Sequence, residues 1–158
     1  MHSRDLEAFE GFRTVAQLTS ERCASVPARP GVYIVVTDAR APAFLEIGTG
    51  GHFKDRDPNV GLQVLQDNWV PGTDILYIGK AGGGTSGSTL KKRLWQYLRF
   101  GRGEKVGHWG GRYIWQLGNA AELRIGWAGI ADARAAEADL IRRFVGAHGK
   151  RPFANLQD

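Results

Sequence analysis

The residues best suited to chemistry gather between positions 75 and 103, ILYIGKAGGGTSGSTLKKRLWQYLRFGRG. Arg93 and Tyr97 are one helical turn apart, so a helix would place both side chains over the same spot.

Residues 91–105 hold six basic residues and one acid, Glu104. Positive charge around a helix is typical of contacts with nucleic-acid phosphates. The cations that we expect to bind nucleic acid are Lys91, Lys92, Arg99, Arg102 and Lys105. The alternative is a solvated helix face that only aids solubility.

Glu137 is the acid whose position is most informative. Leu140, Ile141, Phe144 and Val145 would form the buried stripe of a late helix, and Glu137 precedes Ile141 by one turn. A carboxylate beside a buried stripe loses solvation unless a cation or a metal ion compensates it. The alternative is a partly exposed glutamate that the helix dipole favours near the start of the helix.

A glycine-rich stretch at residues 82–87, GGGTSG, fits the spacing of a dinucleotide-binding loop between a strand and a helix. The helix that follows opens with basic residues, however, and no acid stands at the end of a second strand about 20 residues on. Gly79-Lys80 also lacks the following Ser or Thr of a phosphate-binding P-loop. These departures argue against a nucleotide site.

Three elements would position the chemical residues. Val32–Thr37 is apolar on both faces and predicts a central strand. Ile75–Gly79 predicts a second, covered strand. Ser88 or Thr89 would cap the basic helix, whose buried stripe is Leu90, Leu94, Tyr97 and Leu98.

The rest of the first half is harder to interpret. The sequence of residues 4–24 predicts a helical segment. It belongs to an N-terminal extension that covers residues 1–29. Residues 38–72 predict an insertion that hangs from the sheet, with a short strand at Phe44–Ile47 and a short helix at Val60–Trp69.

In the second half, Arg112–Leu117 and Glu122–Trp127 give a hairpin signal, and we expect one or both of these runs to belong to the sheet. A last helix would begin after Asp132, a good N-cap, and end at Gly149. The whole chain, residues 1–158, is therefore predicted to form a single α/β (α+β) domain with a small, mostly antiparallel central sheet flanked by helices.

The composition narrows the classes of protein. The 158 residues carry a net charge of +5 and one cysteine, Cys23, which excludes a disulfide within the chain and favours a reducing compartment. No apolar run approaches the roughly 20 residues that span a membrane, and the N-terminus lacks the apolar region of a signal peptide. We expect a cytoplasmic protein that does not bind membranes.

Several of these residues fall in the order of a known family. They are Gly31-Val32-Tyr33, Tyr77-Ile78-Gly79 with Lys80, Arg93 with Tyr97, Glu137 and Asn155. In this order the chain resembles the GIY-YIG nuclease superfamily. Two features depart from the family pattern. The two tripeptides usually lie closer together than they do here, because residues 38–72 intervene, and the first reads GVY.

The resemblance implies a metal-dependent DNA endonuclease that uses one divalent ion, Mg²⁺ or Mn²⁺. By that resemblance Glu137 would bind the metal and Arg93 would stabilise charge on the phosphate in the transition state. Tyr33 or Tyr77 would orient or deprotonate the attacking water, although a free tyrosine has a pKa of about 10. Lys80 is either the base or a phosphate contact.

Three further residues have two interpretations each. Tyr97 orients its neighbours by hydrogen bonding or only packs. Asn155 fixes the glutamate or the active-site loop, or is a turn residue. His108 is an accessory base or phosphate contact, or an ordinary loop histidine.

The rival function is a catalytically silent nucleic-acid-binding module that acts with a partner. The DNA substrate is not specified by the sequence, so specificity would come from residues 38–72, from a homodimer or from a partner protein.

Overall fold

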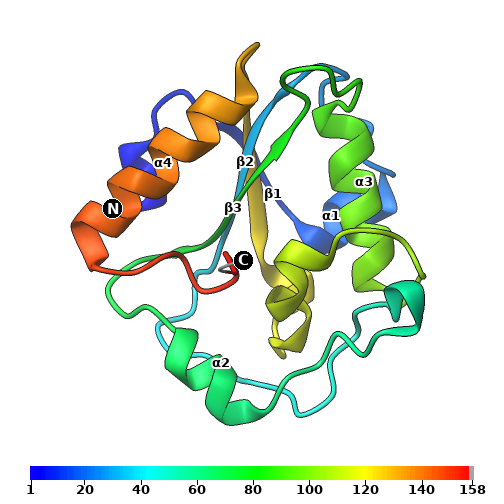
Figure 1. The fold of residues 1–158 in the computed structure, drawn as a ribbon, viewed down its shortest axis with the longest axis vertical. Coiled ribbons are helices and arrows are strands. Elements are labelled where there is room, and N and C mark those ends of the chain that lie inside the picture. The colour runs from blue at the N-terminus through cyan, green and yellow to red at the C-terminus, as the bar shows by residue number, and fades with distance from the viewer. Residues whose placement is uncertain (157–158) are drawn as a thin grey trace.

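The centre of the protein is a four-stranded antiparallel sheet, seen in a computed structural model that describes residues 1–156 (Figure 1). The strand order is β1-β4-β2-β3. The strands are β1 Glu10–Thr14, β2 Gly31–Val36, β3 Ile75–Ala81 and β4 Arg124–Gly129. Every residue of β2 is buried, as expected for a strand that is apolar on both faces. The predicted α+β class with an antiparallel sheet is confirmed.

The two long helices, α3 (Leu90–Gly101) and α4 (Ala133–His148), cover opposite faces of the sheet (Figure 1). Alternate residues of a strand point to opposite faces. Tyr33 of β2 therefore belongs to the core beneath α3, whereas Val32 and Ile34 belong to the core beneath α4. The edge strand β3 lies between these two layers, so its side chains can contribute to a site that both helices reach.

The ends of both helices follow the predicted signals. The side chain of Thr89 accepts a hydrogen bond from the Lys92 amide, and that of Asp132 accepts one from the Ala135 amide. Gly149 ends α4 with a φ of 78°, a left-handed conformation that glycine adopts without steric cost.

The N-terminal segment differs from the prediction of a helix over residues 4–24. It contains a 3₁₀ turn at Ser3–Asp5, strand β1 and the short helix α1, Val15–Ser20. Gly11 and Phe12 have φ values of 87° and 51°, which a right-handed helix cannot accommodate, and β1 pairs with β4 instead. Pairing with the sheet outweighed the local helical pattern.

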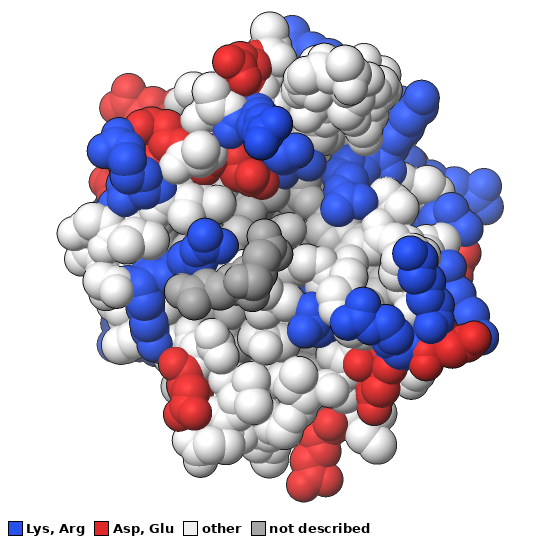
Figure 2. Space-filling model, in the orientation of Figure 1, with Lys and Arg blue, Asp and Glu red and all other residues white. Residues whose placement is uncertain are grey.

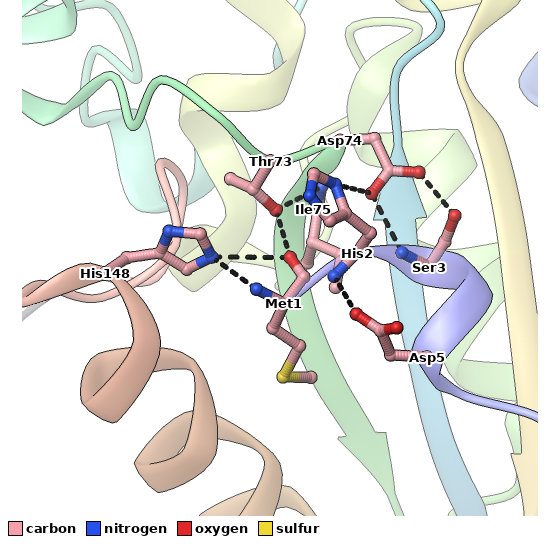
Figure 3. A network of polar contacts seen from close by, with 8 residues as sticks. All are labelled: Met1, His2, Ser3, Asp5, Thr73, Asp74, Ile75 and His148. Atoms are coloured by element: carbon pink, nitrogen blue, oxygen red, sulfur yellow. Dashed lines mark hydrogen bonds and ion pairs between the residues drawn. The ribbon is translucent and has the colours of Figure 1, made fainter.

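Polar contacts attach the first residues to the start of β3 and to the end of α4 (Figure 3). The Thr73 hydroxyl donates to the Met1 carbonyl at 2.6 Å, and the Ser3 amide donates to Asp74 at 2.8 Å. The Met1 amino group lies 2.8 Å from Nε2 of His148. The N-terminal segment is thus fixed beside the strand that carries the candidate site.

One of the runs Arg112–Leu117 and Glu122–Trp127 belongs to the sheet, but the predicted hairpin does not form. The second run forms β4, but residues Trp109–Gln116 form a 3₁₀ helix, η3. Its Tyr113, Ile114 and Trp115 are buried against the α3 side of the core. These three residues are consecutive, so they point in different directions from the 3₁₀ helix and are all buried. This explains an apolar run that suggested a strand.

The insertion, residues 38–72, contains a 3₁₀ turn at Phe53–Asp55 and the helix α2 (Leu62–Asn68), which lies within the predicted range Val60–Trp69. The predicted strand at Phe44–Ile47 is wrong: Phe44 makes only an isolated bridge to Leu117. The buried amide of Gln116 holds the insertion instead, because its nitrogen donates to the carbonyls of Leu45 and Val60 at 3.1 and 2.9 Å. Its oxygen accepts from the Val60 amide at 2.9 Å.

Within the part of the chain that the structure describes, no helix is both long and apolar enough to cross a membrane.

Candidate active site

Two adjoining hollows lie beside β3, and both are lined by Tyr77 and Glu137. The smaller hollow has a volume of about 430 Å³, and the larger about 740 Å³. The predicted site residues that line the smaller hollow are Tyr33, Tyr77, Lys80, Arg93 and Glu137. They come from β2, β3, α3 and α4, so the fold brings together residues that are far apart in the sequence.

The close approach of β2 and β3 explains the glycine of the second tripeptide. Gly79 pairs with Tyr33 across the two strands. A Cβ atom at Gly79 would lie 2.4 Å from Cζ of Tyr33, which is too close for any side chain. Glycine is therefore required there for the Tyr33 ring to lie over β3.

Arg93 projects from α3 into the smaller hollow, where neighbouring acceptors orient it. Its Nη1 donates to the Gln96 side chain at 2.9 Å and to the Gly107 carbonyl at 3.0 Å. Neither Arg93 nor Lys80 forms an ion pair with a carboxylate of residues 1–156. Both cations are thus free to bind an anionic ligand, and the fixed guanidinium suits two oxygens of a phosphate.

Glu137 is half-buried on α4, on the wall that the two hollows share. Burial raises the pKa of this carboxyl above its ordinary value, and Lys80, Arg93 and Arg151 limit the rise. A raised carboxyl pKa at a concave surface is typical of a functional position.

The donor set around Glu137 fits one kind of metal ion. Among residues 1–156 no three His, Cys, Asp or Glu side chains converge, so a structural zinc site is not formed there. Mg²⁺ and Mn²⁺ prefer oxygen ligands, and Mg²⁺ keeps most of its waters while it binds one or two carboxylates and a substrate phosphate. A single carboxylate facing a hollow with two free cations is compatible with that mode.

The two tyrosines are protonated in the folded protein. Burial raises the pKa of Tyr77 to about 12, although Arg93 opposes the shift. Burial also raises the pKa of Tyr33 well above its ordinary value. In this state neither hydroxyl is a free phenolate, and Tyr77, which is 8% exposed where Tyr33 is fully buried, is the tyrosine that a water molecule can reach.

His108 differs from its predicted role as a nucleic-acid contact. It is fully buried, and its Nε2 lies 2.6 Å from the Tyr33 hydroxyl oxygen. Burial, followed by the charge of Arg93, lowers its pKa well below the ordinary value, so the ring is neutral near pH 7. Because His108 has no exposed surface, it cannot contact a nucleic acid from this position, and its polar contact is with the Tyr33 hydroxyl.

Tyr97 is also buried and acts on its neighbours. Its ring stacks on His108, with centroids 3.9 Å apart and planes 15° from parallel, and its hydroxyl donates to the Gly111 carbonyl at 3.0 Å. Both predicted interpretations describe part of these contacts, because the Tyr97 hydroxyl forms a hydrogen bond while its ring packs on His108.

Asn155 is bonded to β3, and no hydrogen bond joins its side chain to Glu137 within residues 1–156. Its side-chain oxygen accepts from the Ile78 amide at 2.9 Å, and its nitrogen donates to the Ile78 carbonyl at 2.8 Å. Ile78 follows Tyr77, so Asn155 holds the backbone beside one of the tyrosines of the site.

The predicted cluster of cations on α3 is partly neutralised. Figure 2 shows Lys and Arg together with Asp and Glu on the side of α3. Arg99 and Arg102 both pair with Glu104, and Lys105 pairs with Asp55. Lys91 and Lys92 form no ion pair within residues 1–156.

Other cations, which the sequence pattern did not single out, line the larger hollow. They are Arg112, Lys150 and Arg151. Arg112 stands in a run that suggested a strand, and Lys150 and Arg151 follow the last helix, so only tertiary structure brings them to the same hollow.

No protein-family model, curated protein or solved structure matches this chain.

Proposed function

We propose that the protein is a metal-dependent nuclease that hydrolyses DNA phosphodiester bonds with one Mg²⁺ or Mn²⁺ ion. The observation that carries this proposal is the smaller hollow. It gathers two tyrosines, two unpaired cations and one half-buried carboxylate, which is the set that the resemblance to GIY-YIG nucleases implies.

The residues of the hollow divide the work by their charge. Arg93 binds the oxygens of the scissile phosphate and stabilises the charge that develops on them. Lys80, on β3, binds the scissile phosphate or the phosphate next to it in the DNA strand. Glu137 holds the divalent ion, which supplies Lewis-acid stabilisation of the leaving oxygen when it is bound.

The Tyr33 hydroxyl oxygen and Nε2 of His108 lie 2.6 Å apart, and the tautomer of His108 decides which of the two donates. In the tautomer with hydrogen on Nδ1, Nε2 of His108 accepts the hydroxyl hydrogen of Tyr33. Tyr33 has no solvent-accessible surface, so it supports the neighbouring Tyr77 ring, whose centroid lies 6.0 Å away. Tyr77 lines both hollows and orients the attacking water toward the phosphate.

A cleavage assay with an Arg93→Ala variant tests the proposal. We expect the wild-type protein to nick supercoiled plasmid DNA with Mg²⁺ or Mn²⁺ and to stop in EDTA, and Arg93→Ala to lose about 100-fold or more in rate, the size typical of a lost oxyanion-stabilising donor. Arg124→Ala is the matched control, because Arg124 lines neither hollow. Retarded migration of DNA without nicking, in both metals, would favour the silent binding module instead.

A further inference from the structure

The larger hollow has a different chemistry from the smaller one, although they share a wall. The smaller hollow is lined by cations, serine side chains and tyrosines, which suits a phosphate. The larger hollow adds flat or apolar surfaces from Trp109, Tyr113, Ile141, Pro152 and Leu156. Its volume of about 740 Å³ lies within the range of about 300–1,000 Å³ typical of pockets for organic ligands.

Arg112 marks the larger hollow as a site for a ligand that is both flat and anionic. Its guanidinium lies 4.5 Å from the Trp109 ring centroid and 5.5 Å from that of Tyr113, and Nη1 donates to the Trp109 carbonyl at 3.2 Å. The group is half-buried, yet it forms no ion pair with a carboxylate of residues 1–156. Arg56 also lies over the Trp109 ring, 4.5 Å from its centroid, so a base entering the hollow would stack on a guanidinium of this cluster. A guanidinium can both stack on a base and bind a phosphate.

The charges of the larger hollow also favour an anionic ligand. Its cations are Arg112, Lys150 and Arg151, and Glu137 is the one acid among the described lining residues. Glu137 stands on the wall toward the smaller hollow, so the charged lining residues that the structure describes in the remaining part are all cations. A nucleotide whose phosphate lies at Glu137 and the metal would therefore have its neighbouring base and sugar beside Arg112.

We propose that the larger hollow binds one unpaired nucleobase next to the scissile phosphate, so that the preferred substrate is DNA with a single-stranded or extruded nucleotide at the cut. This inference rests on the proposed nuclease function for the position of the phosphate. A base within a duplex is stacked on both sides and cannot enter a pocket of one-nucleotide size without leaving the helix. Single-stranded DNA offers its bases without that cost, and aromatic rings bind them without strong sequence preference.

Binding measurements in EDTA test the inference separately from cleavage. We would titrate a fluorescein-labelled single strand, its blunt duplex and the same duplex with one bulged nucleotide, following anisotropy. The expected result is tighter binding of the single strand and the bulged duplex, and a loss of about fivefold or more for these two DNAs in Trp109→Ala and Arg112→Ala. Arg124→Ala, which removes a charge that is paired with Asp38 outside both hollows, should change all three affinities by less than about twofold.

A readout in the wild-type protein guards against variants that fail to fold. The base analogue 2-aminopurine, placed at the bulge, should be quenched on binding by stacking in the larger hollow. Asn68→Ala, at an exposed lining position, should weaken the quenching without affecting the core. Equal affinity for the three DNAs, or an equal loss for all three in Arg112→Ala, would overturn the inference even if the protein cleaves DNA. Selective binding of unpaired DNA without any cleavage would uphold it and count against the nuclease.

Discussion

Nε2 of His108 lies 2.6 Å from the hydroxyl oxygen of Tyr33, and both side chains are fully buried. The contact joins the segment before η3 to the central strand β2, and the ring of Tyr97 stacks on the histidine from α3. β2, α3 and the segment before η3 therefore meet at Tyr33. Tyr33 lies in the wall of the smaller hollow, where we place the phosphate.

The burial of His108 predicts a pH-dependent stability. Its pKa is lowered well below 6.5 in the folded protein, mainly by burial, so the unfolded chain takes up the proton first as the pH falls. Its contribution to the free energy of unfolding is therefore complete above about pH 6.5 and declines below it, by at most about 1.4 kcal/mol per pH unit.

Urea unfolding at pH 8 and pH 5 checks this expectation. The wild-type protein should lose more stability between the two pH values than His108→Asn does. His52→Asn, at an exposed position, serves as the control and should behave like the wild type. Equal losses in His108→Asn and the wild type would show that His108 is not the group responsible.

Asn155 predicts a test of how β3 is held. Asn155→Ala would remove both hydrogen bonds to Ile78 and leave the amide of a buried residue without its partner. We expect a loss of about 1–3 kcal/mol in the free energy of unfolding. Asn155→Asp keeps the acceptor for the Ile78 amide but places a carboxylate oxygen against the Ile78 carbonyl, so it should not restore stability. Denaturant titration of both variants measures this, and a neutral Asn155→Ala would contradict the role.

Gln116 predicts local control of the insertion. Gln116→Leu would fill a similar volume but lose the bonds to Leu45 and Val60. We expect amide hydrogen exchange to accelerate in residues 43–62, while β2 and β3 stay protected, because the core does not depend on these bonds. Exchange that accelerates equally in the strands would mean that Gln116 supports the whole fold.

The elements that a single pattern defines were predictable from the sequence. The apolar runs of β2 and β3 and the capped stripes of α3 and α4 each gave a consistent local signal, and the structure agrees with them. The local sequence of the N-terminal segment predicted a helix that does not form. Gly11 and Phe12 have positive φ values there, and β1 pairs with β4. Such pairing across the chain leaves little trace in local sequence.

The site was predictable to the extent that it resembles a family pattern. Tyr33, Tyr77, Lys80, Arg93 and Glu137 were named from the sequence, and the fold places all of them around one hollow. The burial of His108 was not foreseen, because GHWGG has the composition of an exposed loop. The pairing of Arg99, Arg102 and Lys105 with acids was missed for the same reason: charge counts do not reveal contacts.

Glu137→Gln shows whether Glu137 holds a catalytic metal ion. The substitution keeps the shape of the side chain and removes the carboxylate. Since burial raises the pKa of Glu137, its charge opposes folding at high pH, and the variant should be as stable as the wild type at pH 8 or more so.

We would measure nicking of supercoiled plasmid and cleavage of single-stranded DNA with Mg²⁺, Mn²⁺ and EDTA, for wild type and Glu137→Gln purified identically. We expect metal-dependent cleavage by the wild type, and none by the equally stable variant. Cleavage by Glu137→Gln at the wild-type rate would contradict this expectation.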